Sequence, residues 1–326
     1  MRRREVIAGI ASAASAGWPL APRAQPAGKI YRLGVLEAIP AASNMANLEG
    51  LRRGLRNRGY VEGRNLVIEY RSADGNPERF ADLAADLARL KVDIIVTRGT
   101  PATVAAKHAT ETIPLVMATM GAPGSIVASF ARPGGNVTGV TTFSTELSAK
   151  RIEILKELAP GLSRVALLHN LGNPAVPPEW EETKRAARLL GIDAELLDVR
   201  KQDDVGAAFE LATRRHVDAI VVGADGLIQA NQQTIIEFAA RNRLPAVYPA
   251  REFVEAGGLV AYAINYPDMY YSLATFIDKI LRGEKPSELP VEQPTRFELV
   301  INGTTAKRLG LQLAPTLLAR ADEVIE

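Results

Sequence analysis

Cysteine is absent from this 326-residue chain, and histidine occurs only three times. Without thiols the chain has no disulfide, thiolate metal site, cysteine nucleophile or lipid-bearing cysteine. The histidines are scattered and never stand at the spacing of a metal-binding pair, so we expect no bound metal ion and no other cofactor. They are His108, His169 and His216.

Long apolar runs and a strong charge of either sign are also missing. No apolar stretch beyond residue 27 reaches the roughly 18 residues of a membrane span. Residues 1–27 hold four arginines and one glutamate, so they contribute +3 to the overall formal charge of +2, and residues 28–326 contribute −1. Without a basic surface, the chain from residue 28 onward is not expected to bind nucleic acid or to be embedded in a membrane.

Signatures of common enzymes are absent as well. There is no Gly-x-Ser-x-Gly elbow, no phosphate loop ending in Gly-Lys-Ser or Gly-Lys-Thr, and no Gly-x-Gly-x-x-Gly after the first expected strand. Two adjacent acid pairs, Glu181-Glu182 and Asp203-Asp204, fall on expected helix surfaces, where solvated charges are commoner than acid–base pairs. The sequence therefore favours a binding protein over an enzyme.

The first 27 residues have a composition of their own. Three consecutive arginines, residues 2–4, precede the mostly apolar run 6–21 and a segment of small residues and proline. This pattern predicts an export signal of the twin-arginine type, cut between Ala24 and Ala27. A disordered basic tail is the alternative. We expect the cleaved protein to be periplasmic.

From residue 30 onward, apolar runs of strand length alternate with segments of helical spacing. Continuous apolar strands that alternate with amphipathic helices predict parallel sheets covered on both faces. At 326 residues, with 47% hydrophobic residues, the chain is expected to form two domains. The pattern starts again after residue 142, so the predicted fold is α/β, with two doubly wound parallel-sheet lobes.

Residues 131–142 lie between the similar halves and combine three glycines and a proline with a short β-branched run. We interpret this stretch as a hinge where the chain passes from one lobe to the other. A strand and a helix remain after the second sheet, which predicts return crossings at 257–262 and 290–297. The expected lobes are 28–140 with 263–290, and 141–262 with 291–326.

In open parallel sheets, ligands bind beyond the carboxyl ends of the strands, where loops and helix amino termini converge. We therefore expect a ligand site between the lobes, formed by the loops that follow the strands and by tyrosines near the crossings. The candidate residues are Glu37, Ala38, Gly99, Thr100, Pro101, Met120, Gly121, Asn170, Asn173, Ala224, Asp225, Tyr248 and Tyr262.

Each candidate also has a purely structural interpretation. Thr100 stands either at a carboxylate-binding helix start or at a plain helix cap. Asp225, followed by glycine, suits a turn somewhat better than a ligand ammonium. Tyr248 and Tyr262 offer flat faces to an aromatic ligand or pack in the core near the hinge.

Two further residues were weighed for the same cleft and favoured as structural. His169 ends an apolar strand, where a buried histidine paired within the protein is expected more often than a ligand contact. Arg98 precedes Gly99, and we interpret it as a solvated surface charge.

Several stretches, spread in order over nearly the whole chain, resemble the extracytoplasmic substrate-binding proteins of ABC transporters, in the group with tryptophan- and tyrosine-binding members. They are residues 59–65 running into 68–71, 99–102 with 105–107, 128–139, 255–259, 290–295 and 320–326. The resemblance implies a type I periplasmic-binding fold, two lobes that close over a small ligand, and an ABC transporter permease as partner. A monomer is expected.

One loop departs from the family pattern. The family's turn after the fourth strand reads Gly-Asp-Pro and is longer, whereas this chain has Gly121-Ala122-Pro123. The expected ligand is an aromatic amino acid or an aromatic carboxylate, with Thr100 at the carboxylate and Tyr248 or Tyr262 at the ring. A ligand sensor that signals to a membrane receptor and a secreted enzyme on the same scaffold are the alternatives. No helix-turn-helix segment precedes residue 30, which argues against the cytoplasmic repressors that share this fold.

Overall fold

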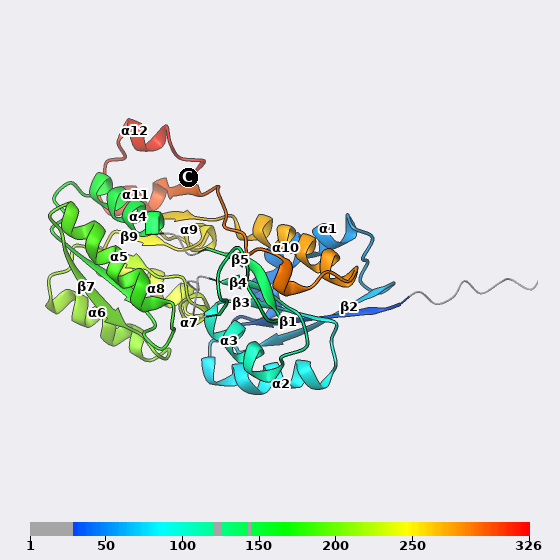
Figure 1. The fold of residues 1–326 in the computed structure, drawn as a ribbon. Coiled ribbons are helices and arrows are strands. Elements are labelled where there is room, and N and C mark those ends of the chain that lie inside the picture. Colours follow the sequence, from blue (N-terminus) through cyan, green and yellow to red (C-terminus); the bar gives the residue numbers. More distant parts are fainter. Residues whose placement is uncertain (1–28, 120–125, 143–144) are drawn as a thin grey trace, which may run out of the picture.

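The computed structural model describes residues 29–119, 126–142 and 145–326. The predicted export signal, the candidate residues Met120 and Gly121, and the loop 121–125 lie outside the described residues. The described chain forms two α/β lobes that lie end to end (Figure 1). The predicted fold class is therefore confirmed.

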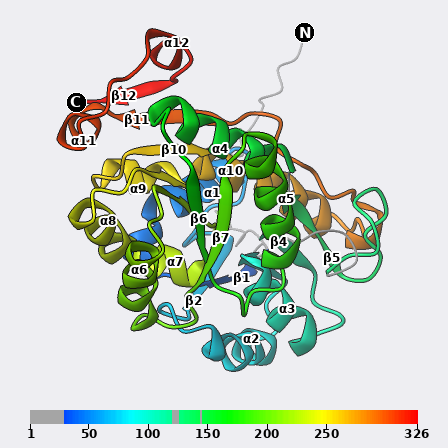
Figure 2. The same ribbon diagram turned by 90° about the vertical axis from the view of Figure 1, so that its left-hand side faces the viewer.

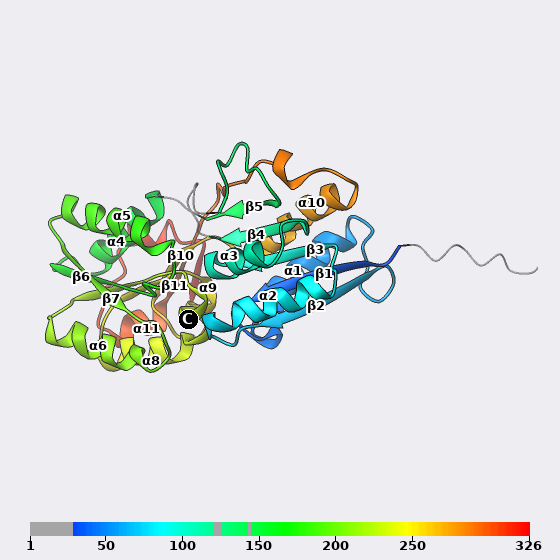
Figure 3. The same ribbon diagram turned by 60° about the horizontal axis from the view of Figure 1, so that its bottom comes forward.

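The first lobe contains a sheet of five parallel strands in the order β2-β1-β3-β4-β5. Helices α1 and α10 cover one face of this sheet, and α2 and α3 cover the other (Figure 3). The strands are β1 (Tyr31–Glu37), β2 (Leu66–Ser72), β3 (Ile94–Arg98), β4 (Leu115–Thr119) and β5 (Val137–Thr141). The helices are α1 (Met45–Arg56), α2 (Phe80–Arg89), α3 (Thr100–Ala109) and α10 (Tyr266–Leu281), with short 3-10 turns at Ala41–Asn44, Pro77–Arg79 and Pro286–Glu288.

The second lobe contains seven strands in the order β12-β11-β10-β9-β8-β6-β7, parallel except for the antiparallel pair β10–β11. Figure 2 looks at this lobe along the long axis of the molecule. The strands are β6 (Arg164–His169), β7 (Asp193–Asp198), β8 (Ala219–Val222), β9 (Ala246–Tyr248), β10 (Val260–Ala263), β11 (Glu298–Asn302) and β12 (Glu323–Ile325).

Helices cover both faces of the second sheet, so its buried strands are apolar on both sides. One face packs against α4 (Thr145–Leu158), α5 (Val176–Leu189), α11 (Gly303–Arg308) and α12 (Pro315–Leu318). The other packs against α6 (Asp204–Arg214), α7 (Gly226–Ala230), α8 (Gln232–Arg241) and α9 (Arg251–Glu255).

The chain passes between the lobes three times. It leaves the first lobe after β5, returns at residues 264–265 between β10 and α10, and leaves again along residues 291–297 towards β11. The first and third crossings are hydrogen-bonded side by side, because Thr141 N donates to Glu292 O (2.9 Å) and Glu292 N donates to Gly139 O (2.9 Å). The second crossing begins at the end of β10, just after the stretch 257–262 expected from sequence.

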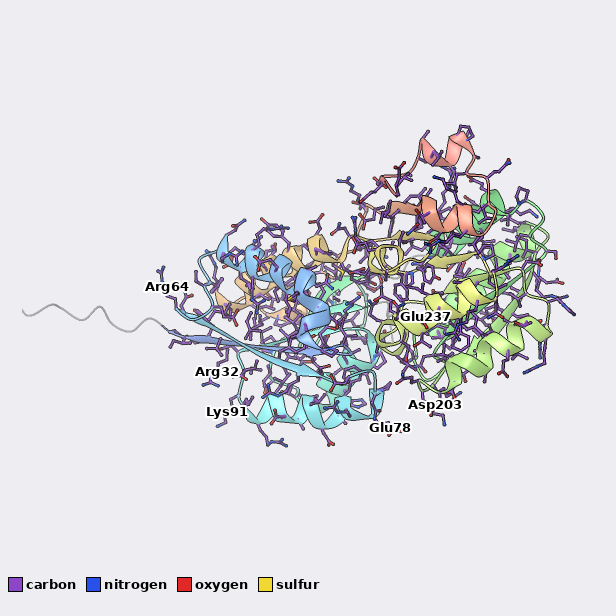
Figure 4. All side chains as sticks on the ribbon, turned by 180° about the vertical axis from the view of Figure 1, so that it is seen from behind. Arg32, Arg64, Glu78, Lys91, Asp203 and Glu237 are labelled. Carbon is purple, nitrogen blue, oxygen red and sulfur yellow. The ribbon has the colours of Figure 1, made fainter. Side chains whose placement is uncertain are left out.

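Helices α1 and α10 are far apart in sequence but pack closely, because α1 presents glycines to its partner. A Cβ on Gly50 would lie 2.2 Å from Pro267 O, and one on Gly54 would lie 2.5 Å from Tyr271 O. The return of the chain after the second crossing thus completes the first lobe. Labelled charges such as Arg32, Lys91 and Asp203 are exposed on the outer surface (Figure 4).

Most predicted elements are present, and the differences are local. The C-terminal residues form the four-residue α12 and then strand β12, which pairs with β11. Helices α7 and α9 have five residues each, too few for a helical repeat to be visible in the sequence. Of these, α7 matters most because it faces the first lobe.

Candidate functional site

A cavity of about 580 Å³, including its mouth, lies between the lobes. The carboxyl ends of β1, β3 and β4 form its floor in the first lobe, and the loops after β6, β8 and β9 close it from the second lobe. The start of α10 forms a further wall.

Seven of the thirteen predicted residues line this cavity, and four described ones do not. The lining residues are Glu37, Ala38, Gly99, Thr100, Asn173, Ala224 and Asp225. Pro101, Asn170, Tyr248 and Tyr262 are absent from the lining. The residues chosen by their position beyond the strand ends thus lie mostly in this cavity, whereas the two tyrosines lie outside its lining.

Glu37 ends β1 at the bottom of the cavity, with 1% of its surface exposed. Its Oε1 accepts hydrogen bonds from Asn44 Nδ2 (3.1 Å) and from the Tyr270 hydroxyl. Its Oε2 is buried and has no hydrogen-bond partner among the described residues. Burial raises the pKa of Glu37, and the charge of Arg98, the two side-chain hydrogen bonds and the backbone N–H of Ala38 only partly offset this rise.

Arg98 ends β3 directly beside Glu37, because β1 and β3 are parallel neighbours with Leu36 opposite Thr97. Its guanidinium lies 4.3 Å from the centre of the Tyr266 ring, a cation–π contact. Burial lowers the pKa of Arg98, but the electrostatic effects of Glu37, Tyr270, Tyr266 and Glu252 together raise it more, so the group stays charged. The expectation that Arg98 is a solvated surface charge is wrong, since it lines the cavity.

Gly99 turns the chain from β3 into α3, and its φ of 84° explains why glycine stands there. Gly99, rather than Thr100, is the cap residue, and its carbonyl accepts from Thr103 N (3.1 Å). Thr100 is the first residue of the helix and is 1% exposed. The positive end of the α3 dipole therefore points at the cavity near Arg98, which favours an anionic group.

Asp225 lies opposite, at the start of α7, and both of its oxygens are already paired. Oδ1 accepts from Leu227 N (2.8 Å) and, at 3.4 Å, from Asn170 Nδ2, while Oδ2 accepts from Asn173 Nδ2 (2.8 Å). The turn interpretation of Asp225 thus describes its contacts, since it caps α7. Asn170 supports this carboxylate from behind and does not line the cavity.

Both predicted tyrosines pack within the second lobe. Tyr248 is 1% exposed and stacks on Phe253 with ring centres 5.1 Å apart. Tyr262 packs against Phe297 of the third crossing at 5.8 Å. Both belong to strands, so their side chains point to sheet faces covered by other elements, and the core-packing alternative describes their contacts.

Tyr266 and Met269 on α10 line the cavity with an aromatic ring and a thioether. The search followed strand ends, whereas these residues start the helix after the second crossing. The sequence Asn265-Tyr266-Pro267 is typical of a helix start, with an asparagine cap followed by proline in the first turn. In the structure Asn265 Oδ1 accepts from Asp268 N (3.0 Å), so this pattern could have indicated that Tyr266 lies at the start of a helix beside the crossing. The other lining residues missed from sequence are Ile39, Ala118, Thr142, Gly226, Gln229 and Pro249.

His169 belongs to a buried ionic group behind the loops of the second lobe, consistent with the structural role expected for it. Its Nε2 lies 3.0 Å from Glu179 Oε2, and Arg151 Nη1 lies 3.7 Å from Glu179 Oε1. Burial lowers the pKa of His169, but the charge and hydrogen bond of Glu179, together with the charge of Asp225, raise it more. Burial raises the pKa of Glu179, but His169 and Arg151 together lower it more. The ring packs against Gly223, where a Cβ would lie 1.9 Å from His169 Cδ2.

The lobes touch at one edge of the cavity, so the structure is closed there. A Cβ on Gly226 of α7 would lie 2.4 Å from the Cβ of Ala38. A Cβ on Gly75 would lie 2.8 Å from the Cβ of Ala230. Small residues on both lobes therefore permit this approach.

Within residues 29–119, 126–142 and 145–326, no group of three or more His, Asp or Glu side chains is placed to hold a metal ion. No helix in the same residues is both long enough and apolar enough to cross a membrane.

Two lobes joined by three crossings, with a cavity formed by the loops of both, define the class of two-lobed solute-binding proteins. Residues 32–325 match the family described as ABC transporter substrate binding protein. The chain belongs to this family, which is extracytoplasmic and non-enzymatic. It is the substrate-binding component of an ABC transporter.

Among relatives, the chain is 23% identical to the tyrosine-binding protein of Clostridioides difficile, over 87% of this chain and 82% of the relative. It superposes on a domain crystallised with L-Trp from Streptococcus pneumonia with a TM-score of 0.85 and 27% identity, covering 91% of this chain and all of the other. A conserved domain protein from Vibrio cholerae matches with a TM-score of 0.85, 28% identity and the same coverage.

Proposed function

We propose that the chain captures an aromatic amino acid or a related aromatic carboxylate in the periplasm and delivers it to the permease of an ABC importer. The observation that carries this proposal is the two-sided character of the cavity. Arg98 and the start of α3 form a pole for an anion, while Ile39, Pro249 and Met269 form an apolar wall. The tyrosine- and L-Trp-binding relatives support the same ligand class.

The ligand's carboxylate is placed at Arg98 and the α3 amino terminus, where a charge-assisted hydrogen bond and the helix dipole act together. Its ring lies against the apolar wall and the edge of Tyr266. Binding bridges both lobes and stabilises the closed form, and the permease recognises that form. The three crossings support lobe boundaries at 28–140 with 263–290 and at 141–262 with 291–326.

Export by the twin-arginine route, with cleavage between Ala24 and Ala27, and a monomeric state belong to the same proposal. A second candidate role, in addition to transport, is that of a sensor that signals to a membrane receptor, because closure would serve this role equally well. A receptor gene next to the coding gene would favour this additional role.

A thermal-shift screen of the twenty amino acids, aromatic acids and sugars tests the ligand class. A ligand present at 100 times its Kd adds about 2.7 kcal/mol to the free energy of unfolding. For a protein of this size we expect a rise in Tm of about 5 °C with L-tryptophan or L-tyrosine. A rise with sugars alone would refute the proposed class.

A further inference from the structure

Two opposite charges of the first lobe line the same cavity without bonding to each other. Glu37 and Arg98 end neighbouring strands, and their charges attract, but they form no ion pair within 4.0 Å. Glu37 Oε2 has no hydrogen-bond partner among the described residues. The Arg98 guanidinium, within the same described part of the chain, contacts the Tyr266 ring but makes no hydrogen bond.

An unpaired carboxylate oxygen is costly in a buried site. Leaving such an acceptor unsatisfied costs about 1–3 kcal/mol, and more when it is charged. Around Glu37, Tyr70 OH donates to Ile39 O (2.7 Å) and Asn47 Nδ2 donates to Asn44 Oδ1 (2.8 Å). Asn47 Oδ1 is also buried without a partner among the described residues, but it belongs to a neutral amide, whereas Glu37 Oε2 belongs to a carboxylate that lines the cavity. The site therefore satisfies one oxygen of Glu37 fully and leaves the other for a group that the protein does not supply.

Asp225 is the other carboxylate on the cavity wall, and it is a poor partner for a ligand cation. Its two oxygens already accept three hydrogen bonds, from Leu227 N, Asn170 Nδ2 and Asn173 Nδ2. One of these bonds caps α7. A ligand ammonium would have to compete with these contacts at Asp225, whereas at Glu37 it meets an oxygen with no competitor among the described residues.

We infer that Glu37 is the specificity-determining residue for a ligand ammonium, and that Glu37 with Arg98 selects zwitterionic α-amino acids over carboxylates that lack the amino group. The carboxylate of the ligand lies at Arg98 and its ammonium at Glu37 Oε2, so one small head group satisfies both charges. This inference rests on the proposed function and narrows it, since aromatic acids without an amino group become poor ligands.

The head group would then be held entirely by the first lobe, because both residues belong to it. The second lobe contributes Asn173, Gln229 and Pro249, which close over the remainder of the ligand. The first lobe thus recognises the class of ligand, and the second lobe determines the side chain and closure.

The test measures Kd by titration calorimetry for L-tryptophan and for indole-3-propionate, which has the same ring and carboxylate but no amino group. In the unsubstituted protein the amino acid should bind about 100-fold more tightly, because the acid leaves Glu37 unpaired. In Glu37→Gln this ratio should fall below about tenfold. Gln keeps an oxygen for Asn44 and Tyr270, and binding of the acid itself verifies that the variant folds.

Asp225→Asn is the matched control, because it neutralises the other carboxylate of the same cavity. It should change both affinities by a similar factor and keep the ratio near 100-fold. The inference would be overturned if the ratio of the two Kd values were unchanged in Glu37→Gln or fell below about tenfold in Asp225→Asn. In either case, binding of L-tryptophan to the unsubstituted protein would leave the proposed function standing.

Arg98→Met provides a second arm with tryptamine, which lacks the carboxylate. The preference for L-tryptophan over tryptamine should disappear in this variant, and a preserved preference would contradict the assignment. If the unsubstituted protein binds only aliphatic amino acids, Glu37→Gln is tested with one of these and with the corresponding acid that lacks the amino group. If Glu37→Gln then loses the preference for the amino acid, the proposed aromatic ligand class is refuted and this inference stands. If no amino acid binds at all, both fall.

Discussion

Gly226→Ala should weaken ligand binding without destabilising either lobe. The added Cβ would lie 2.4 Å from the Cβ of Ala38 across the cavity edge. Carbon atoms pack best at about 3.5–4.0 Å, so the lobes would have to separate by about 1 Å at this point. Ala38 Cβ is fixed to the backbone and has no rotamer by which to move away.

The size of the effect follows from overpacking, which costs about 1–3 kcal/mol. The cost falls on the closed form alone, because in the open form the two residues no longer meet. Ligand affinity should therefore fall about 5- to 150-fold, measured by calorimetry with L-tryptophan. Gly226 is the first residue of α7, and alanine has a higher helix propensity than glycine. The substitution should therefore not lower the Tm of the ligand-free protein by weakening this helix.

Ala38→Gly should restore the affinity of the Gly226→Ala variant, since it removes the methyl group with which the new Cβ collides. A double-mutant cycle then gives a coupling of the same size as the loss. Gly161→Ala is the matched control: no heavy atom within 4 Å would meet its Cβ, so its affinity should stay unchanged. Unchanged binding in Gly226→Ala, or failure of Ala38→Gly to restore it, would refute closure at this contact.

The remaining predictions concern stability. Gly54→Ala should lower the free energy of unfolding by about 2 kcal/mol, because the new Cβ would lie 2.5 Å from Tyr271 O. Urea titration measures this change. A urea midpoint equal to that of the Gly161→Ala control would contradict the prediction. The His169–Glu179 pair should contribute most to the free energy of unfolding between about pH 4.5 and 6.5. The raised pKa of His169 adds stability that is fully present below the ordinary histidine pKa of 6.5 and is lost as the pH rises through the pKa in the folded protein. The lowered pKa of Glu179 adds stability that is present above 4.5 and is lost as the pH falls through the folded value. His169→Asn should remove the loss above pH 6.5, and an unchanged pH profile would refute the pairing.

Local pattern was sufficient for the architecture. Apolar runs of strand length alternate with helices throughout, so the two parallel sheets and the residues at their carboxyl ends could be read without coordinates. Glu37, Gly99 and Thr100, each chosen for its position relative to a strand, line the cavity. The loops of the second lobe that carry Asn173 and Asp225 were found in the same way.

Side-chain direction and pairing were not available from that pattern. Tyr248 looked like a cleft residue, yet strand alternation points it into a face covered by helices, where Phe253 stacks on it. Arg98 looked like a surface charge, yet the return of α10 to the first lobe places Tyr266 over its guanidinium. The surroundings of these two side chains are not determined by their neighbours in sequence. Residues 98 and 266, for example, meet only because the chain returns to the first lobe at the second crossing.

By itself, then, the sequence determined the fold class, the two lobes and the edge of each sheet at which a ligand would sit, because these follow from local periodicity and chain direction. Only the tertiary structure decided which charges face the cavity and which are already satisfied. Asp225 and Glu37 are both acids that follow or end a strand, but the former caps a helix and binds two asparagines, while the latter keeps a buried oxygen unpaired. That difference arises from contacts between segments distant in the chain.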